Sequence, residues 1–437
     1  MMAYQKAVKQ VATLILVMLT LVACGPLAVT SVPEASTSAA MPLATTQAPP
    51  SSMPTLGPLV NATTTGTIAR DEIWRGEVHL TGDIGMANDA VLTIEPGTVV
   101  FVASNSDDQH CCPGDFDDEY TRTNNDPTRF EAWNMNTIQI NGQGGVIRAV
   151  GTPEEPVIFR PEGESTSPAQ WEGVHLERGT IKYATLLYGG HTAIQILRNS
   201  GEQIEIAHNE VRYFLWAGID SHTDGVWIHH NIVEGGGHQA IGVRGNTLAE
   251  HNVVIGAQTG IAVENGAGAV VRNNIVIDSA RGMELRSGSD ISVVNNTIAW
   301  IGGPPDGWYY HWTLIYPPFE YGGGIETYLE TPEITVTNNI IFGAFDWGIG
   351  LHQQPGAGSV VDYNLIWGPS AQYVGAAQNA SGANSLSLDP LFADSSATDF
   401  TLLDGSPARD AGDPSVFDAD GSRSDLGAYG GPEGQGW

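Results

Sequence analysis

The sequence predicts an all-β fold in which short parallel strands coil into a solenoid with about 22 residues per coil. Two recurring strings predict it. The first, Asn-x-[Val/Ile], keeps gaps of 21–25 residues except for one of 43, at Asn209, Asn231, Asn252, Asn274, Asn296, Asn339 and Asn364. The second, Gly/Ala-[Ile/Met]-x-[Val/Leu], keeps the same period from residues 218, 240, 260, 282, 324 and 348. A fixed period of this length indicates repeats that stack on one another.

Within each repeat the apolar residues alternate with period two, as Ile261 and Val263 do, and most are β-branched. Gly, Asn and Asp bound these short runs, which is the pattern of strands and turns. No helical period extends over ten residues after position 70. Stacked coils lie about 4.8 Å apart, so the recurring Asn side chains can hydrogen-bond along one column.

Composition excludes several classes of protein. The 437 residues carry 49 acidic and 18 basic side chains, a net charge of −31 that disfavours nucleic acid as a partner. Apolar residues make up 41%, which is enough for a sizeable core. The three cysteines are too few for a disulfide scaffold.

The N-terminus has the features of an export signal. Lys6 and Lys9 precede an apolar run from Val11 to Val22, which is shorter than the roughly 20 residues of a membrane span. The string Leu-Val-Ala-Cys-Gly that ends at residue 25 resembles the lipobox of bacterial lipoproteins, which implies lipidation of Cys24. The alternative is a secretory signal with a chance cysteine. We therefore expect a protein anchored by lipid to the outer side of a bacterial cell membrane.

The rest of the chain divides by composition. After the signal peptide (1–23), residues 24–69 are mostly Ser, Thr, Ala and Pro and predict a disordered tether. Residues 70–390 carry the repeats, and residues 391–437 form a loop-rich tail. We expect a monomer.

The paired strings resemble the right-handed parallel β-helix repeat of the pectate-lyase-like superfamily. The resemblance is clear from Ile194 to Ile366 and extends to the strings at 92–100 and 406–413. It implies a right-handed β-helix. The superfamily includes lyases, hydrolases, epimerases and adhesins, and we recognise none of its specific catalytic motifs in this sequence.

Two outward columns follow if the Ile and Val/Leu of the second string face inward. The first is Asp220, Gly242, Ala262, Glu284, Glu326 and Gly350, and the second is His222, Arg244, Glu264, Arg286, Tyr328 and His352. In the enzymes that this fold resembles, the site lies on the outer face of one sheet. The alternative is a solvated face with Glu–Arg pairs between coils.

Roles for these residues depend on the coil spacing. If no coil intervenes, Glu284 and Glu326 are neighbours, as in a retaining glycosidase. For a lyase or epimerase, the base would be Arg286, Tyr328 or His222, and Arg244 or a bound cation would neutralise a uronate carboxylate. We include Asp220 in the catalytic set.

The 43-residue gap predicts one coil plus an insertion at residues 301–323. Its aromatic side chains suit stacking on sugar rings and include Trp308, Tyr309, Tyr310 and Trp312. The alternative is a loop whose aromatic residues pack on one another.

Metal sites are a further expectation. Asp418, Asp420 and Asp425 resemble the start of a Ca²⁺ loop but lack the closing glutamate of an EF-hand. A second acidic segment, residues 104–133, contains the adjacent Cys111 and Cys112. The column His208, His230 and His251 continues as Asn273, Asn295 and Asn338, so a polar ladder competes with a transition-metal site.

Three functions remain open. The first is a surface-anchored, carbohydrate-active enzyme, a lyase, hydrolase or epimerase acting on an extracellular polysaccharide. The second is a non-catalytic carbohydrate-binding or adhesive surface protein. The third is a structural role in the cell envelope. The aromatic insertion supports the first two equally.

Overall fold

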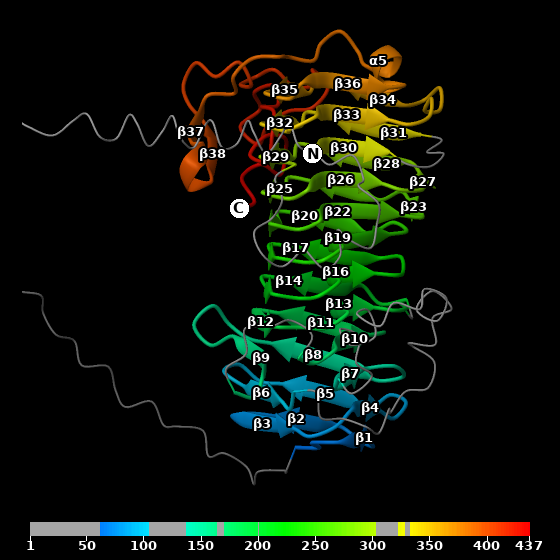
Figure 1. Ribbon diagram of the computed structural model, residues 1–437. Helices are drawn as coiled ribbons and strands as arrows, with labels where there is room; N and C mark the ends of the chain where they lie inside the picture. The colour runs from blue at the N-terminus through cyan, green and yellow to red at the C-terminus, as the bar shows by residue number, and fades with distance from the viewer. Residues whose placement is uncertain (1–61, 105–136, 164–169, 200, 303–321, 328–332) are drawn as a thin grey trace, which may run out of the picture. The chain divides into compact units, whose positions relative to one another are not determined.

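The computed structural model describes residues 62–104, 137–163, 170–199, 201–302, 322–327 and 333–437. All the described residues belong to one compact unit, Leu59–Trp437. Three long parallel sheets, which we name A, B and C, make up most of this unit (Figure 1). None of the helices among the described residues could serve as a membrane span.

Each coil contributes one short strand to each sheet, except the last, which contributes only β36 to sheet A. Sheet A contains β1 (Gly66–Ile68), β4 (Ile84–Met86), β7 (Gln139–Asn141), β10 (Gly173–Leu176), β13 (Thr192–Ile196), β16 (Ala217–Ser221), β19 (Gln239–Arg244), β22 (Thr259–Glu264), β26 (Arg281–Leu285), β30 (Gly323–Thr327), β33 (Trp347–Leu351) and β36 (Ala371–Gly375). Sheet B contains β2 (Glu72–Trp74), β5 (Val91–Ile94), β8 (Val146–Val150), β11 (Gly179–Lys182), β14 (Ile204–Ala207), β17 (Val226–His229), β20 (Leu248–Glu250), β24 (Val270–Arg272), β28 (Ile291–Val294), β31 (Ile334–Thr337) and β34 (Val360–Asp362). Sheet C contains β3 (Glu77–Leu80), β6 (Val99–Val102), β9 (Val157–Pro161), β12 (Ala184–Leu187), β15 (Glu210–Arg212), β18 (Ile232–Glu234), β21 (Val253–Ile255), β25 (Ile275–Ile277), β29 (Thr297–Ala299), β32 (Ile340–Phe342) and β35 (Leu365–Trp367).

Smaller elements complete the described unit. Strands β23 (Gly266–Ala267) and β27 (Gly288–Ser289) pair in parallel, and β37 (Phe392–Asp394) and β38 (Asp399–Leu402) form an antiparallel pair in the tail. One short helix, α5 (Ala377–Ala380), follows β36, and one 3₁₀ turn, η1 (Ser395–Ala397), lies in the tail.

The register of sheet A confirms the predicted solenoid. Ile219 pairs with Ile241, Ile241 with Ile261, Ile261 with Met283, and Met283 with Ile325. These steps are 22, 20, 22 and 42 residues long. The long step is therefore a single coil that carries an insertion, as the sequence predicted.

The core consists of like side chains stacked coil upon coil. Ile219, Ile241, Ile261 and Ile325 are completely buried, and most strands bury at least every second residue. The residue before each isoleucine, which is Ala240 in one coil and glycine in the other three, is also buried. A Cβ at Gly282 would lie 2.2 Å from the carbonyl oxygen of Gly324 and 2.6 Å from Cγ2 of Ile298. Glycine therefore recurs because successive coils approach closely at this corner.

The recurring asparagines form a continuous buried ladder. Each Nδ2 from Asn209 to Asn339 donates to the Oδ1 of the next asparagine at 2.9–3.0 Å. Each Oδ1 from Asn231 to Asn364 also accepts the backbone N–H of the preceding asparagine, at 2.9–3.1 Å. The amide groups thus satisfy one another inside the corner between sheets B and C.

The residue before each of six ladder asparagines has a left-handed backbone conformation. The φ angles of His208, His230, His251, Asn273, Asn295 and Asn338 lie between 52° and 59°. Asparagine and histidine are enriched in this region of conformational space. We name these six residues the corner column.

The tail lies along the corner column. Asn338 accepts from the backbone N–H of Asp413 at 2.8 Å, and Asn273 donates to the carbonyl of Gly430 at 2.8 Å. His251 and His230 continue the series, with ring nitrogens 2.8 Å from the carbonyl oxygen of Glu433 and 2.5 Å from that of Gly436. The last 25 residues therefore contact several coils in succession, as the red segment in Figure 1 shows.

Candidate functional site

The outer face of sheet A brings together the charged residues that the sequence singled out. Register pairs stack Asp220, Gly242, Ala262, Glu284, Glu326 and Gly350 in one column. Arg244 and Glu264 of the second column are likewise paired. Glu284 and Glu326 are direct neighbours, so no coil separates them.

Glu284 is held by two arginines. Its Oε1 lies 2.5 Å from Nη1 of Arg281, and its Oε2 lies 2.7 Å from Nη2 of Arg286. The hydroxyl of Thr259 donates to the same Oε2 at 3.0 Å. Burial raises the pKa of Glu284, but the charges of Arg286 and Arg281 outweigh it and lower the pKa below its ordinary value. Glu284 is therefore an ionised carboxylate.

Glu264 links Arg244 to Arg286 across three coils. Nη2 of Arg244 lies 2.5 Å from Oε2 of Glu264, and Nη1 of Arg286 contacts Oε1. Burial raises the pKa of Glu264, but the charges of Arg286 and Arg244 lower it overall. Arg286 therefore bridges Glu264 and Glu284.

Glu326 has the opposite electrostatic environment. Its side chain is 4% exposed, and its Oε1 lies 2.8 Å from Nε2 of His352. Its Oε2 is buried and has no hydrogen-bond partner among the described residues. Burial raises the pKa of Glu326 and the charge of Glu284 adds to this, whereas His352 and Arg281 lower it, and the result lies above the ordinary value of 4.5.

Asp220 and His222 form a pair at the other end of the face. Nε2 of His222 lies 2.8 Å from Oδ2 of Asp220, whose side chain is buried. Burial raises the pKa of Asp220, but the hydrogen bond from His222 and the charges of His222 and Arg244 lower it overall. An ionised carboxylate that orients an imidazole is an arrangement suited to general base catalysis.

Sequence reasoning missed a third group of residues on this face. Gln239, Thr259 and Arg281 precede the recurring Gly/Ala and face outward, since Gln239 and Thr259 contact Arg286 and Glu284 respectively. Strict alternation from the isoleucine would place these three residues inside. It fails because glycine and isoleucine both face the interior at this corner.

Aromatic rings stack from coil to coil at the position directly before Gln239 and its equivalents in other coils. Trp216 lies between His191 and His238, with ring centroids 5.6 Å and 4.2 Å apart. Burial and the charge of Arg286 lower the pKa of His238 to about 4. The signal for this group was the aromatic residue two places before the Gly/Ala, at Trp216 and His238.

Several predicted site residues lie outside the described residues. They are the proposed base Tyr328, the sugar-stacking residues Trp308, Tyr309, Tyr310 and Trp312, the lipidation site Cys24, and the pair Cys111 and Cys112.

Each of the three tail aspartates accepts hydrogen bonds from other parts of the tail. Asp418 accepts from the backbone N–H groups of Gly431 and Asp425, Asp420 from that of Ser422, and Asp425 from that of Asp410. Burial raises the pKa of Asp418 and of Asp425. Among the described residues, the group of side chains that is placed to hold a metal ion consists of histidines, and calcium binding by the three aspartates stays a prediction.

Comparison with known proteins agrees with this architecture. Residues 173–385 match a family model described as a right-handed β-helix region. The described unit is a right-handed parallel β-helix. No curated protein matches this chain by sequence.

Several solved structures are similar to this chain, including the following three. The A-module of a mannuronan C-5 epimerase from Azotobacter vinelandii is 11% identical, with a TM-score of 0.32 over 74% of this chain and 91% of that one. A mannuronic acid-specific polysaccharide family 6 lyase from human gut microbiota is 15% identical, with a TM-score of 0.30 over 66% and 77%. Pectate lyase Pel9A is 13% identical, with a TM-score of 0.35 over 82% and 96%.

Proposed function

We propose that this protein is a cell-surface enzyme that hydrolyses an extracellular polysaccharide on the outer face of sheet A. One observation carries the proposal. Glu284 and Glu326 are register neighbours whose environments shift their pKa values in opposite directions. Two carboxyl groups separated in this way can act as an acid and its ionised partner.

Glu326 is the proposed general acid. Its raised pKa keeps the proton on the carboxyl group to a higher pH than in an ordinary glutamate. In the proposed reaction Glu326 gives this proton to the glycosidic oxygen as the bond to the anomeric carbon breaks. His352, 2.8 Å from Oε1, orients the group.

Glu284 is the proposed nucleophile. Paired residues of adjacent strands have Cα atoms about 4.8 Å apart, which favours the roughly 5–5.5 Å carboxyl separation of retaining enzymes. The Glu284 carboxylate would attack the anomeric carbon and form a glycosyl-enzyme ester. A water molecule would then release the sugar, giving its proton back to Glu326.

The rest of the face supports a polymeric substrate. Asp220 and Glu326 lie four coils apart, about 19 Å at 4.8 Å per coil, which spans several sugar units. The described strand β30 directly follows the aromatic insertion, so stacking residues would enter beside Glu326. The lipobox-like string at Cys24 supports anchoring of the enzyme at the bacterial surface.

A non-catalytic carbohydrate-binding protein is the second candidate. The observation that favours it is the enclosure of Glu284, which is 2% exposed and has hydrogen bonds on both oxygens. A nucleophile must reach the anomeric carbon, so in the enzyme the Arg281 and Arg286 contacts would have to loosen on substrate binding.

The test compares the full chain with Glu326→Gln and Glu284→Gln on neutral and uronic polysaccharides, with and without Ca²⁺. Glu234→Gln is the matched control, because Glu234 pairs with Arg212 on sheet C, away from the site. We expect the wild-type chain to release new reducing ends without unsaturated products. The rate of this release should fall at least about hundredfold in Glu326→Gln and in Glu284→Gln, and it should be unchanged in Glu234→Gln. Unsaturated products would indicate that the enzyme is a lyase, and the catalytic base would then be assigned to His222. If the wild-type chain is retained on an immobilised glycan but releases no product, the result would support the non-catalytic carbohydrate-binding protein instead of the enzyme.

A further inference from the structure

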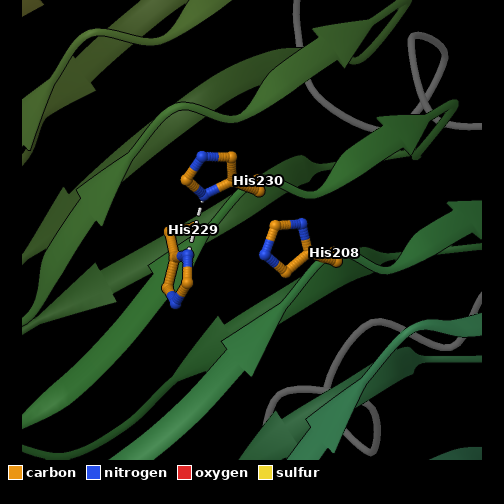
Figure 2. A group of neighbouring side chains, drawn as sticks. All are labelled: His208, His229 and His230. Carbon is orange, nitrogen blue, oxygen red and sulfur yellow. Dashed lines mark hydrogen bonds between the residues drawn. The ribbon is translucent and has the colours of Figure 1, made fainter. Parts of the chain in front are cut away.

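Three histidines cluster at the corner between sheets B and C. His229 ends β17, and His208 and His230 belong to the corner column. One ring nitrogen from each lies within 4.8 Å of those of the other two. Figure 2 shows the His208 ring beside the rings of His229 and His230, which are nearly perpendicular to each other.

The outer nitrogens of two of these rings are already engaged. Nε2 of His229 lies 3.1 Å from Oε1 of Glu205, and Nε2 of His230 lies 2.5 Å from the carbonyl oxygen of Gly436. Burial raises the pKa of Glu205, but hydrogen bonds from Lys182 and His229 lower it overall, so the carboxylate only accepts. A carbonyl oxygen also only accepts. Both Nε2 atoms therefore carry a hydrogen.

The two Nδ1 atoms face each other. They are 2.8 Å apart, as the dashed line in Figure 2 marks. In neutral imidazoles with hydrogen on Nε2, each Nδ1 offers a lone pair, and two lone pairs repel at this distance. The arrangement calls for a positive centre between or beside the two atoms.

We propose that His208, His229 and His230 bind a divalent transition-metal ion, with zinc or copper as the class of metal. Neutral imidazole suits these ions, and three histidines leave one coordination position for water. A small rotation of the rings would open the Nδ1 separation to accommodate Zn–N bonds of about 2.0–2.1 Å. This site lies away from sheet A and does not depend on the function proposed there.

Neighbouring residues orient the ligands as metal sites require. Metal-binding histidines donate their second N–H to a carboxylate or a backbone carbonyl, which are the partners that Glu205 and Gly436 supply. Trp227 stacks on His229 with a centroid distance of 3.9 Å and restricts its ring. Lys182, 2.5 Å from Glu205, is the nearby positive charge that opposes binding.

The corner column provides matched variants. Asn273, Asn295 and Asn338 occupy the same left-handed position, so asparagine is compatible with the backbone at 208, 230 and 251. His208→Asn and His230→Asn remove one ligand each. His251→Asn makes the same change one coil further on, where the ring stacks on His230 but lies outside the group of three.

The experiment titrates the chelator-treated full chain with ZnCl₂ by calorimetry and with CoCl₂ by absorption spectroscopy at pH 7. We expect one Zn²⁺ per chain and the spectrum of Co²⁺ bound by nitrogen at low coordination number. His208→Asn and His230→Asn should weaken Zn²⁺ binding at least tenfold, and His251→Asn should leave it unchanged. Glu205→Gln should weaken it by about 10–100-fold, as loss of an orienting carboxylate does.

Three results would overturn the proposal. The first is no saturable binding of Zn²⁺ or Co²⁺ by the folded wild-type chain, with NMR showing a proton shared between His229 and His230. The second is undiminished binding by folded His208→Asn or His230→Asn. The third is an equal loss in His251→Asn, which would assign the effect to stacking along the column. Circular dichroism shows whether His208→Asn or His230→Asn has unfolded. If one of them has, Zn²⁺ binding by the other, folded variant tests the proposal.

Discussion

Replacing Asn274 by alanine should destabilise the β-helix more than any ordinary surface change. The side chain is completely buried. Its Nδ2 has two hydrogens, which are shared among three acceptors at 2.9–3.0 Å, the carbonyls of Ala249 and Arg272 and Oδ1 of Asn296. Its Oδ1 accepts from N and Nδ2 of Asn252 at 3.0 and 2.9 Å. Alanine leaves all five partner groups inside the corner without this amide.

The expected loss follows from this count. A hydrogen bond contributes about 1 kcal/mol net, so two N–H donors and two accepted hydrogen bonds contribute about 4 kcal/mol. Entry of water and small shifts of the ladder would recover part of this, which leaves about 2–4 kcal/mol. Asn379→Ala is the control, because Asn379 is exposed in helix α5 and its change should stay within about 0.5 kcal/mol.

Two measurements check the prediction together. Urea denaturation followed by circular dichroism gives the change in the free energy of unfolding. Hydrogen exchange of the Asn252 and Asn274 amides reports the local effect, which a repeat protein can show without global unfolding. A loss below about 1 kcal/mol with unchanged exchange at both amides would refute a stabilising role for the ladder.

Three further predictions concern the corner glycines and the acidic face. Gly282→Ala should destabilise by about 1–3 kcal/mol in thermal unfolding, because the new Cβ meets the Gly324 carbonyl, and a wild-type melting temperature would contradict this. Arg281→Met should cost about 3–5 kcal/mol in urea denaturation and raise the pKa of Glu284, because it leaves that buried carboxylate with one arginine; a neutral result would mean that water replaces the guanidinium. Glu326 has a raised pKa in the folded state, so the folded state binds its proton more tightly and stability falls as pH rises from 4.5 through the folded pKa. Glu326→Gln should remove this decline from melting curves measured across that pH range, and parallel curves for the two proteins would show that the group titrates normally.

The repeat made the fold predictable from sequence. Asn274 and Ile261 recur with one period, and a one-coil shift places each on its counterpart. The same rule located the acidic column, since Glu284 and Glu326 hold equivalent places in their coils. Periodicity therefore determined which residues stack.

Periodicity did not determine partners or pKa values. The sequence treated Glu284 and Glu326 as equivalent, but Arg281 faces Glu284 only because the chain turns inward at Gly282. The opposite pKa shifts of the two glutamates depend on that local departure from alternation. Likewise, the approach of Gly436 to His230 joins positions 206 residues apart, and no repeat connects them.

The path of the tail has a consequence for how such a protein can change length during evolution. Successive members of the corner column, from Asn338 back to His230, are contacted in order by tail residues Asp413, Asp425, Gly430, Glu433 and Gly436. A duplicated or deleted coil within that stretch would bring every later tail contact to the wrong coil. A coil gained or lost before His208 would leave the tail contacts unchanged. Natural length variation should therefore concentrate in the coils that precede His208.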